Sequence, residues 1–267
     1  GRVEKGTANG KEWIVDDSKT KTIIVEEKRN AEEKNKLYVI GSGSGFIVSE
    51  EGHIISNEHV VGICKKVVTY KNGKEIELPV IATDYQNDLG LVKLEIHNRN
   101  YLRIKTSGAE LGEEIIVFGY PLSDTLSAGV KLTKGIVSSL TGMNNNTTHI
   151  QIDAAIQPGN SGGPVINSNG EVIGVAVGAL DKMYMMENQD IVPENVNFAI
   201  SSLNLTAFLK ANNVPITYSE VLKEYDTKQL ARIGSLSSIQ LFCKNTKDEY
   251  ARLSENKKYS HVLLDLN

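Results

Sequence analysis

The feature that most constrains this chain is a long succession of short β-type runs separated by turn signals. Between residues 22 and 201, runs rich in Val and Ile alternate with clusters of Gly, Asn and Ser. The clearest runs are "HIIS" (53–56), "EIIVFGY" (114–120), "HIQID" (149–153) and "VIGVAVG" (172–178), with "NG" at 72–73 and "SNG" at 168–170 as turn signals. Strands at this spacing, without helices between them, predict an all-β fold of the sandwich or barrel type rather than βαβ units.

The pattern changes at both ends of this region. Residues 1–20 are polar and irregular, and we expect a flexible lead-in. "SSLNLTAFLKANN" (201–213) has helical spacing, with Ser201 or Ser202 available as N-cap. Residues 214–267 predict a mixed C-terminal extension that packs on the β core: a helix over 219–231, a strand over 238–244, a charged helix, and a last strand over 261–266.

Charge and composition exclude some partners and leave the compartment open. The formal net charge of −4 gives no reason to expect nucleic acid or an anionic membrane surface as a partner. No apolar run approaches the roughly 20 residues of a membrane-spanning helix. The start "GRVEKGTANG" has neither an initiator Met nor a signal-peptide core, so we read it as a processed or excised fragment from which an export signal could have been removed.

Two cysteines, Cys64 and Cys243, lie far apart in the sequence and outside any metal-binding or redox spacing. We expect two separate thiols, with a disulfide between them only in an exported protein. The sequence predicts neither a metal site nor a cofactor site.

The stretch "QPGNSGGPVIN" (157–167) surrounds Ser161 with three glycines and two prolines. A serine hydroxyl becomes a nucleophile only when a base takes its proton, and an orienting group keeps that base in the right tautomer. Because Gly159 has no Cβ, its N–H and that of Ser161 can converge on one oxygen. This stretch therefore predicts a nucleophile with its own oxyanion hole.

His59 and Asp88 are the predicted partners of Ser161. His59 lies in "GHIISNEHVV" just after a β run, and Asp88 directly precedes the apolar run "LGLV". Each competes with a nearby residue of the same type: His53, at the start of a strand, and Asp84, in the polar "TDYQN" turn. The chain order His, Asp, Ser is one of the few known for such a triad.

Five blocks in this order resemble the trypsin-like serine peptidases of the HtrA (Deg) type: "GSGSGFIVSEEGHIISNEHVV", "NDLGLVKLE", "GYPLSDTLSAGVKLTKGIVSSL", "QIDAAIQPGNSGGPVIN" and "VNFAIS". The resemblance implies a peptidase domain over 21–213, built from two six-stranded antiparallel barrels of the chymotrypsin type with the active site between them. It assigns the base to His59, the orienting carboxylate to Asp88, the nucleophile to Ser161, and the oxyanion donors to the N–H groups of Gly159 and Ser161. No PDZ domain, which usually follows the peptidase in this family, is recognised in 214–267.

The same resemblance places an uncharged primary substrate pocket beside the nucleophile, lined by Ala155, Ile156, Val175, Asn197 and Phe198. It implies cleavage after small or medium aliphatic residues, with loose selectivity because one methylene group decides only about 1–3 kcal/mol. Ile156 and Val175 have an alternative role as plain core residues. The expected partners are a protein or peptide substrate and, through the C-terminal extension, a second copy or a regulatory protein.

Two other interpretations stay open. Residues 159–163 also satisfy G-x-S-x-G, the nucleophile elbow of α/β-hydrolases, but that fold needs a helix after the serine, and here strand, turn and strand follow. The second alternative is a catalytically silent member of the trypsin fold that acts as a binding module, since a fold does not determine a function.

Overall fold

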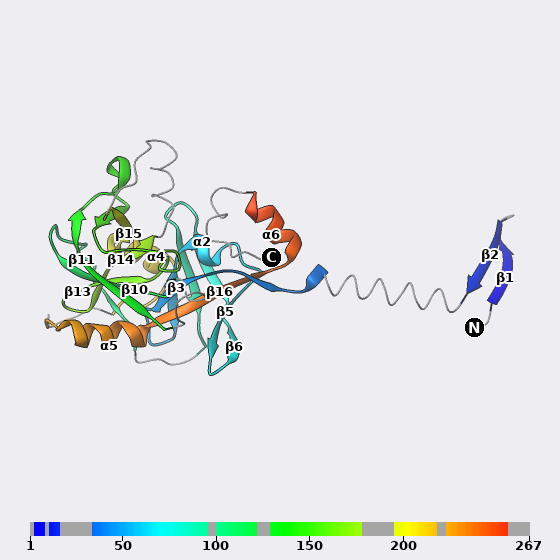
Figure 1. Ribbon diagram of the computed structural model, residues 1–267, viewed down its shortest axis with the longest axis horizontal. Helices are drawn as coiled ribbons and strands as arrows, with labels where there is room; N and C mark the ends of the chain where they lie inside the picture. Colours follow the sequence, from blue (N-terminus) through cyan, green and yellow to red (C-terminus); the bar gives the residue numbers. More distant parts are fainter. Residues whose placement is uncertain are drawn as a thin grey trace.

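The computed structural model describes residues 3–8, 11–16, 34–95, 100–121, 129–177, 195–217 and 223–255. Within them the chain is mostly β, and Figure 1 shows its two seven-stranded sheets side by side with a few helices around them. The all-β class expected from the strand pattern is confirmed. No helix of the described residues is both long enough and apolar enough to cross a bilayer.

The second sheet is a closed barrel. Six strands surround its core, all antiparallel, and pairing of β13 with β14 closes the ring. A two-residue strand, β9 (Arg103–Ile104), adds to β14 in parallel. The six are β10 (Glu114–Gly119), β11 (Lys131–Ser139), β12 (His149–Ile152), β13 (Pro164–Asn167), β14 (Glu171–Val177) and β15 (Asn197–Ser201), with a 3₁₀ turn, η1 (Met143–Asn145), before β12.

The first sheet has one strand more than the six-stranded barrel that the resemblance implies, and it is open within the described residues. It is a half-barrel of seven antiparallel strands in the order β6-β5-β16-β3-β4-β8-β7, so β6 and β7 are its edges within the described residues. Six strands come from the region before residue 100, and one comes from near the C-terminus. They are β3 (Tyr38–Ile47), β4 (His53–Ser56), β5 (Lys66–Lys71), β6 (Lys74–Glu77), β7 (Val80–Asp84), β8 (Leu89–Lys93) and β16 (Ser238–Asn245).

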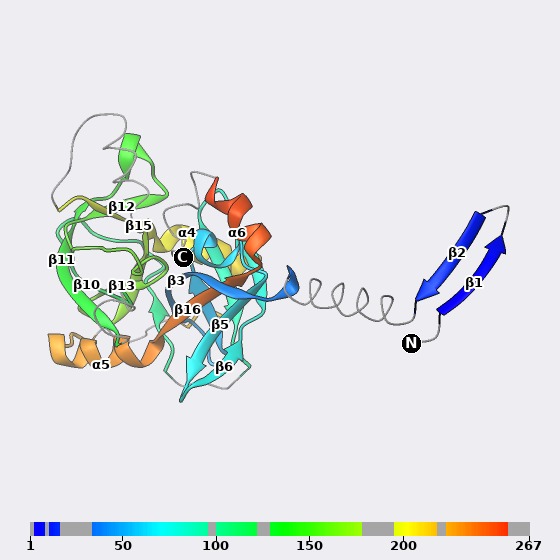
Figure 2. The same ribbon diagram turned by 45° about the vertical axis from the view of Figure 1, so that its right-hand side comes forward.

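Strand β16 is the element through which the C-terminal segment joins this sheet. It pairs with β3 from Ser238 opposite Phe46 to Asn245 opposite Tyr38, and its other edge pairs with β5. Figure 2 shows β16, in orange, lying between these two strands. The strand expected over 238–244 is therefore an inner strand of the first sheet, and over residues 242–244 both of its edges are already paired.

Two helices flank β16 and fasten it to both halves of the molecule. Before it, α5 (Thr227–Ser237) begins at a capping box of Asp226 and Gln229, and its Leu230 lies in the main core. At Gly234 an added Cβ would lie 2.4 Å from the Phe118 ring, so only glycine lets α5 approach β10 this closely. After β16, α6 (Lys247–Ser254) packs on the first sheet through Leu253.

The expectation of two separate thiols was wrong: Cys64 and Cys243 form a disulfide, with their Cα atoms 5.2 Å apart. The pairing of β16 with β5 explains this, because Cys243 lies opposite Val67, three residues after Cys64. The bond therefore ties the C-terminal strand to the loop that follows the helix of His59.

An exposed ion-pair cluster adds to this attachment. The Glu75 carboxylate accepts hydrogen bonds from Lys244 of β16 at 2.6 Å and from Lys66 of β5 at 3.1 Å. The bond from Lys244, followed by that from Lys66, lowers the pKa of Glu75 to about 2.

The interior continues from one sheet into the other. One cluster of buried side chains includes Phe46 and Leu91 of the first sheet, Phe118 and Val175 of the second, and Leu205 of α4. The helix α4 (Ser202–Ala211) begins at Ser201, whose hydroxyl accepts a hydrogen bond from the Leu203 N–H, so Ser201 is the N-cap. This shared core holds the two sheets against each other.

The lead-in expected to be irregular instead contains two antiparallel strands, β1 (Val3–Ala8) and β2 (Lys11–Asp16). The sequence between them is Asn9-Gly10, the pair most typical of a two-residue hairpin loop. The strand-like run at 22–27 and the strand expected over 261–266 lie outside the described residues.

Candidate active site

His59 and Asp88 meet because the strands next to them are neighbours. Ser56, at the end of β4, pairs with Gly90, near the start of β8, so the chain just after β4 lies beside the chain just before β8. His59 lies on a four-residue helix, α2 (Glu58–Val61), that begins directly after β4. The antiparallel pairing thus brings the imidazole to the carboxylate.

Both carboxylate oxygens of Asp88 make close contacts with His59. One carboxylate oxygen of Asp88 lies 2.7 Å from Nδ1 of the His59 ring, and the other accepts the His59 backbone N–H at 2.9 Å. The carbonyl of Asp88 accepts hydrogen bonds from the Glu58 N–H and the Asn57 side chain. His59 is 1% exposed, so its ring is held inside the protein with Nδ1 directed at the carboxylate.

The competing residues have local roles. Asp84 accepts hydrogen bonds from the backbone N–H groups of Gln86 and Asn87 and from the Asn87 side chain, as a turn aspartate does. His53 lies at the start of β4, where its Nδ1 is 2.7 Å from the Ser49 hydroxyl of the preceding turn. Neither contact involves His59.

Ser161 lies in a tight turn between β12 and β13 of the closed barrel and is buried. The Asn160 N–H donates to the Gln157 carbonyl at 3.0 Å, and the Gly163 N–H donates to the Asn160 carbonyl at 2.8 Å. The Ser161 carbonyl accepts the Ser44 N–H at 2.8 Å, which attaches the turn to β3 of the other sheet.

The next residue, Gly162, brings this turn against the segment that carries His59. It has a φ of +83°, and an added Cβ would lie 2.3 Å from the Ser56 hydroxyl and 3.0 Å from the Asn57 N. A glycine is therefore required both by the backbone conformation and by the space. The structure thus brings Ser161 to the end of β4, where α2 with His59 begins.

Gly159, a predicted oxyanion donor, has a backbone conformation that favours glycine. Its φ is +97°, and an added Cβ would lie 2.6 Å from the Tyr120 carbonyl oxygen. Its own carbonyl accepts a hydrogen bond from the Ser44 hydroxyl at 2.6 Å. The sequence reasoning did not single out Ser44, although it lies in the quoted block "GSGSGF".

Comparison with known proteins bears on the family of this chain. Residues 43–175 match the family model of the trypsin-like peptidase domain. The chain is 42% identical over 140 residues to the putative serine protease HhoB of Synechocystis, which covers 51% of this chain and 34% of that protein. It is 36% identical over 181 residues to the human serine protease HTRA4, covering 66% of this chain and 36% of that protein.

A solved structure, that of the serine endoprotease from Yersinia pestis, superposes with a TM-score of 0.52 at 26% identity, covering 69% of this chain and 65% of that one. The chain therefore contains a trypsin-like peptidase domain, and it is similar to the HtrA-type serine proteases. It also resembles the uncharacterized protein y4bJ of Sinorhizobium fredii, at 38% identity over 204 residues, 76% of this chain and 32% of that protein. The chain thus spans about a third of the length of these curated relatives.

In this chain, four of the five predicted pocket residues are buried. Only Ala155 is exposed. Val175 is 0% exposed in the shared core, and Ile156 belongs to the core of the closed barrel, which favours their alternative role as core residues. Asn197 donates a side-chain hydrogen bond to the Ala154 carbonyl at 2.9 Å, and Phe198 is buried beside it on β15.

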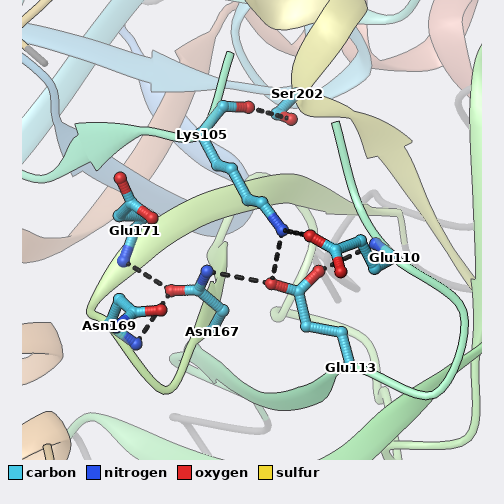
Figure 3. A network of polar contacts seen from close by, with 7 residues as sticks. All are labelled: Lys105, Glu110, Glu113, Asn167, Asn169, Glu171 and Ser202. Carbon is cyan, nitrogen blue, oxygen red and sulfur yellow. Dashed lines mark hydrogen bonds and ion pairs between the residues drawn. The ribbon is translucent and has the colours of Figure 1, made fainter. Parts of the chain in front are cut away.

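A cavity of about 610 Å³ lies between the segment that joins β9 to β10 and the turn between β13 and β14, and no residue of the predicted triad or pocket lines it. Figure 3 shows the polar network at this place, in which Lys105 Nζ bridges Glu110 and Glu113. Asn167 donates to Glu113 and accepts the Glu171 N–H, so the network fastens the turn between β13 and β14. These contacts explain the local fold of the turn.

Proposed function

We propose that this chain is a serine endopeptidase that acts through an acyl-enzyme, with His59, Asp88 and Ser161 as its catalytic residues. The observation that carries the proposal is the contact of both Asp88 carboxylate oxygens with His59, one 2.7 Å from the ring Nδ1 and the other 2.9 Å from the backbone N. A carboxylate on Nδ1 keeps the proton there and leaves Nε2 as the basic nitrogen.

The proposed reaction begins with attack of the Ser161 hydroxyl oxygen on a peptide carbonyl carbon. His59 Nε2 takes the hydroxyl proton as the C–O bond forms, and Asp88 stabilises the resulting imidazolium. The carbonyl oxygen becomes an oxyanion, which the N–H groups of Gly159 and Ser161 stabilise. His59 then gives its proton to the leaving amine as the C–N bond breaks. Water next attacks the acyl carbonyl carbon while His59 takes a proton from it, and His59 returns this proton to the Ser161 oxygen as the C–O bond to the serine breaks.

We further propose that cleavage follows small or medium aliphatic residues. Support comes from the remaining residues predicted for the pocket, Ala155, Asn197 and Phe198, which carry no charge, since a buried carboxylate would select Lys or Arg. Ala155 is its exposed member and follows Ala154, whose carbonyl is held by Asn197. The substrate class is an unfolded protein or peptide.

The test is hydrolysis of unfolded casein, followed by a peptide library, with wild type and Ser161→Ala. Ser235→Ala is the matched control, because Ser235 is exposed on α5 and its hydroxyl only donates to the Ala231 carbonyl. Wild type and Ser235→Ala should cleave alike, while Ser161→Ala should lose nearly all activity. Equal rates for all three proteins would contradict the proposal, and three equally inert proteins would favour the binding module.

A further inference from the structure

The hydroxyl of Ser44 joins three segments of the site. Ser44 lies on β3 with 0% exposure. Its hydroxyl donates to the Gly159 carbonyl at 2.6 Å and accepts the Tyr120 N–H at 2.9 Å. Its backbone N–H donates to the Ser161 carbonyl at 2.8 Å, and its carbonyl accepts the Ser56 hydroxyl at 2.7 Å. Both the donor and an acceptor position of the hydroxyl are thus used on backbone groups.

These bonds fix the peptide group between Gly159 and Asn160 at both ends. Its carbonyl is held by the Ser44 hydroxyl, and its N–H donates to the Gln157 carbonyl at 3.0 Å. Without a Cβ, Gly159 has access to many backbone conformations besides its φ of +97°. Gly159, which makes the turn possible, therefore leaves the peptide group between Gly159 and Asn160 free to rotate unless the Gly159 carbonyl is held.

The surroundings of the Ser44 hydroxyl are closely packed. At Gly119 an added Cβ would lie 3.0 Å from the Ser44 oxygen and 2.9 Å from the Asn160 Cα. Loss of the hydroxyl would therefore leave two partly buried backbone groups, the Gly159 carbonyl and the Tyr120 N–H, without this partner.

We infer that Ser44 is a positioning residue for catalysis: its hydroxyl holds the Gly159 carbonyl and thereby keeps the Gly159 and Ser161 N–H groups aimed at the oxyanion. This inference rests on the proposed function, which assigns those two N–H groups to the oxyanion hole. Ser44 itself touches neither the substrate nor the reacting atoms. It acts through the direction of the turn that carries the nucleophile.

The experiment compares wild type with Ser44→Ala and with the nearly isosteric Ser44→Cys, whose thiol is a weaker donor. Ser237→Ala is the matched control, because Ser237 is also a buried serine, 2% exposed, whose hydroxyl donates to a backbone carbonyl, that of Ile233 at 3.0 Å. Active sites are counted by complete labelling with a fluorophosphonate, so that unfolded protein does not enter the turnover number.

For Ser44→Ala we expect kcat per labelled site to fall about 10- to 100-fold, less than the loss of a whole oxyanion donor, with KM within about threefold of wild type. The fluorophosphonate labelling rate should fall in parallel, and the acidic limb of the pH–rate profile should stay in place, since His59 and Asp88 are untouched. Ser44→Cys should show an intermediate loss, and Ser237→Ala should keep the wild-type kcat per site.

An unchanged kcat per labelled site in Ser44→Ala would overturn the inference. If Ser44→Ala does not fold, Ser44→Cys decides, and wild-type turnover per site in that variant would overturn it equally. A wild-type chain that neither labels nor cleaves would refute the proposed function instead, so the two failures are distinguishable.

Discussion

Replacing Leu241 on β16 by alanine tests whether the C-terminal strand is part of the peptidase core. Leu241 is 0% exposed and lies in one buried cluster with Val60 and Val61 of α2, the helix that carries His59. Its Cδ1 would lie only 3.0 Å from a Cβ added at Gly45, so the strand sits tightly against β3. The site therefore has little room to collapse around a smaller residue.

The expected loss follows from this burial. A fully buried Leu→Ala change costs about 2.7–5.0 kcal/mol, and we expect about 3 kcal/mol for Leu241→Ala. With a urea slope near 3 kcal/mol per M, the unfolding midpoint should fall by about 1 M. Leu236→Ala is the control of identical chemistry, since Leu236 is 51% exposed on α5, and its cost should stay near 0.5 kcal/mol.

Urea unfolding followed by circular dichroism and by peptidase activity measures both variants. In Leu241→Ala the two signals should fall together, because the strand supports the sheet that carries His59. Equal midpoints for Leu241→Ala and Leu236→Ala would refute the reasoning, since β16 would then contribute no more than an exposed helix face.

Three further predictions concern the site and the attachment of β16. Asp88→Asn should lower kcat/KM on the order of 10⁴-fold, because it disturbs the tautomer of His59. Asp84→Asn should stay within a few-fold of wild type in the same peptide assay. The reverse result would contradict the assignment of Asp88 as the orienting carboxylate. Replacing both Cys64 and Cys243 by serine should lower the free energy of unfolding by about 2–4 kcal/mol, as measured in urea, and no change would show that the bond constrains nothing. Because the pKa of Glu75 is lowered from 4.5 to about 2, its ion pairs stabilise the fold above pH 4.5 and lose this effect as the pH falls toward 2. The difference in unfolding free energy between wild type and Glu75→Gln should therefore be small, as for exposed pairs, and vanish toward pH 2, while a difference that grows on acidification would contradict the assignment.

The pairing of His59 with Asp88 could be predicted from the sequence only through the chain order of the three residues and the family resemblance, because local pattern does not choose between Asp88 and Asp84. Each residue adjoins a recognisable strand, and the two strands are neighbours in an antiparallel sheet. The turn at Ser161 could be predicted from its glycines, and two of them, Gly159 and Gly162, have positive φ. Asp84, by contrast, had to be rejected on its contacts, since its sequence setting differs little from that of Asp88.

The place of the C-terminal strand could not be predicted in this way. "SIQLFCK" has the residues of a strand, but its partners β3 and β5 lie far away in the sequence. Strand partners are chosen by packing over the whole sheet rather than by local preference. The disulfide depends on the same pairing, so the expectation of two separate thiols failed for the same reason.

Ser44 shows a different limit. A serine between two glycines in a strand has no local signal that sets it apart from its neighbour Ser42. Its importance becomes visible only when the turn of Gly159, from the other sheet, meets β3. Residues that act through tertiary contacts of this kind are found from structure.

The most direct test of the account is the site of covalent labelling by a fluorophosphonate, read by mass spectrometry of the intact and digested chain. We predict one phosphonyl group per chain, on Ser161, formed by wild type and almost completely lost in His59→Ala. A wild-type chain that stays unlabelled, or labelling of Ser161 that is as fast without the His59 imidazole as with it, would contradict the claim that these side chains act as one catalytic unit.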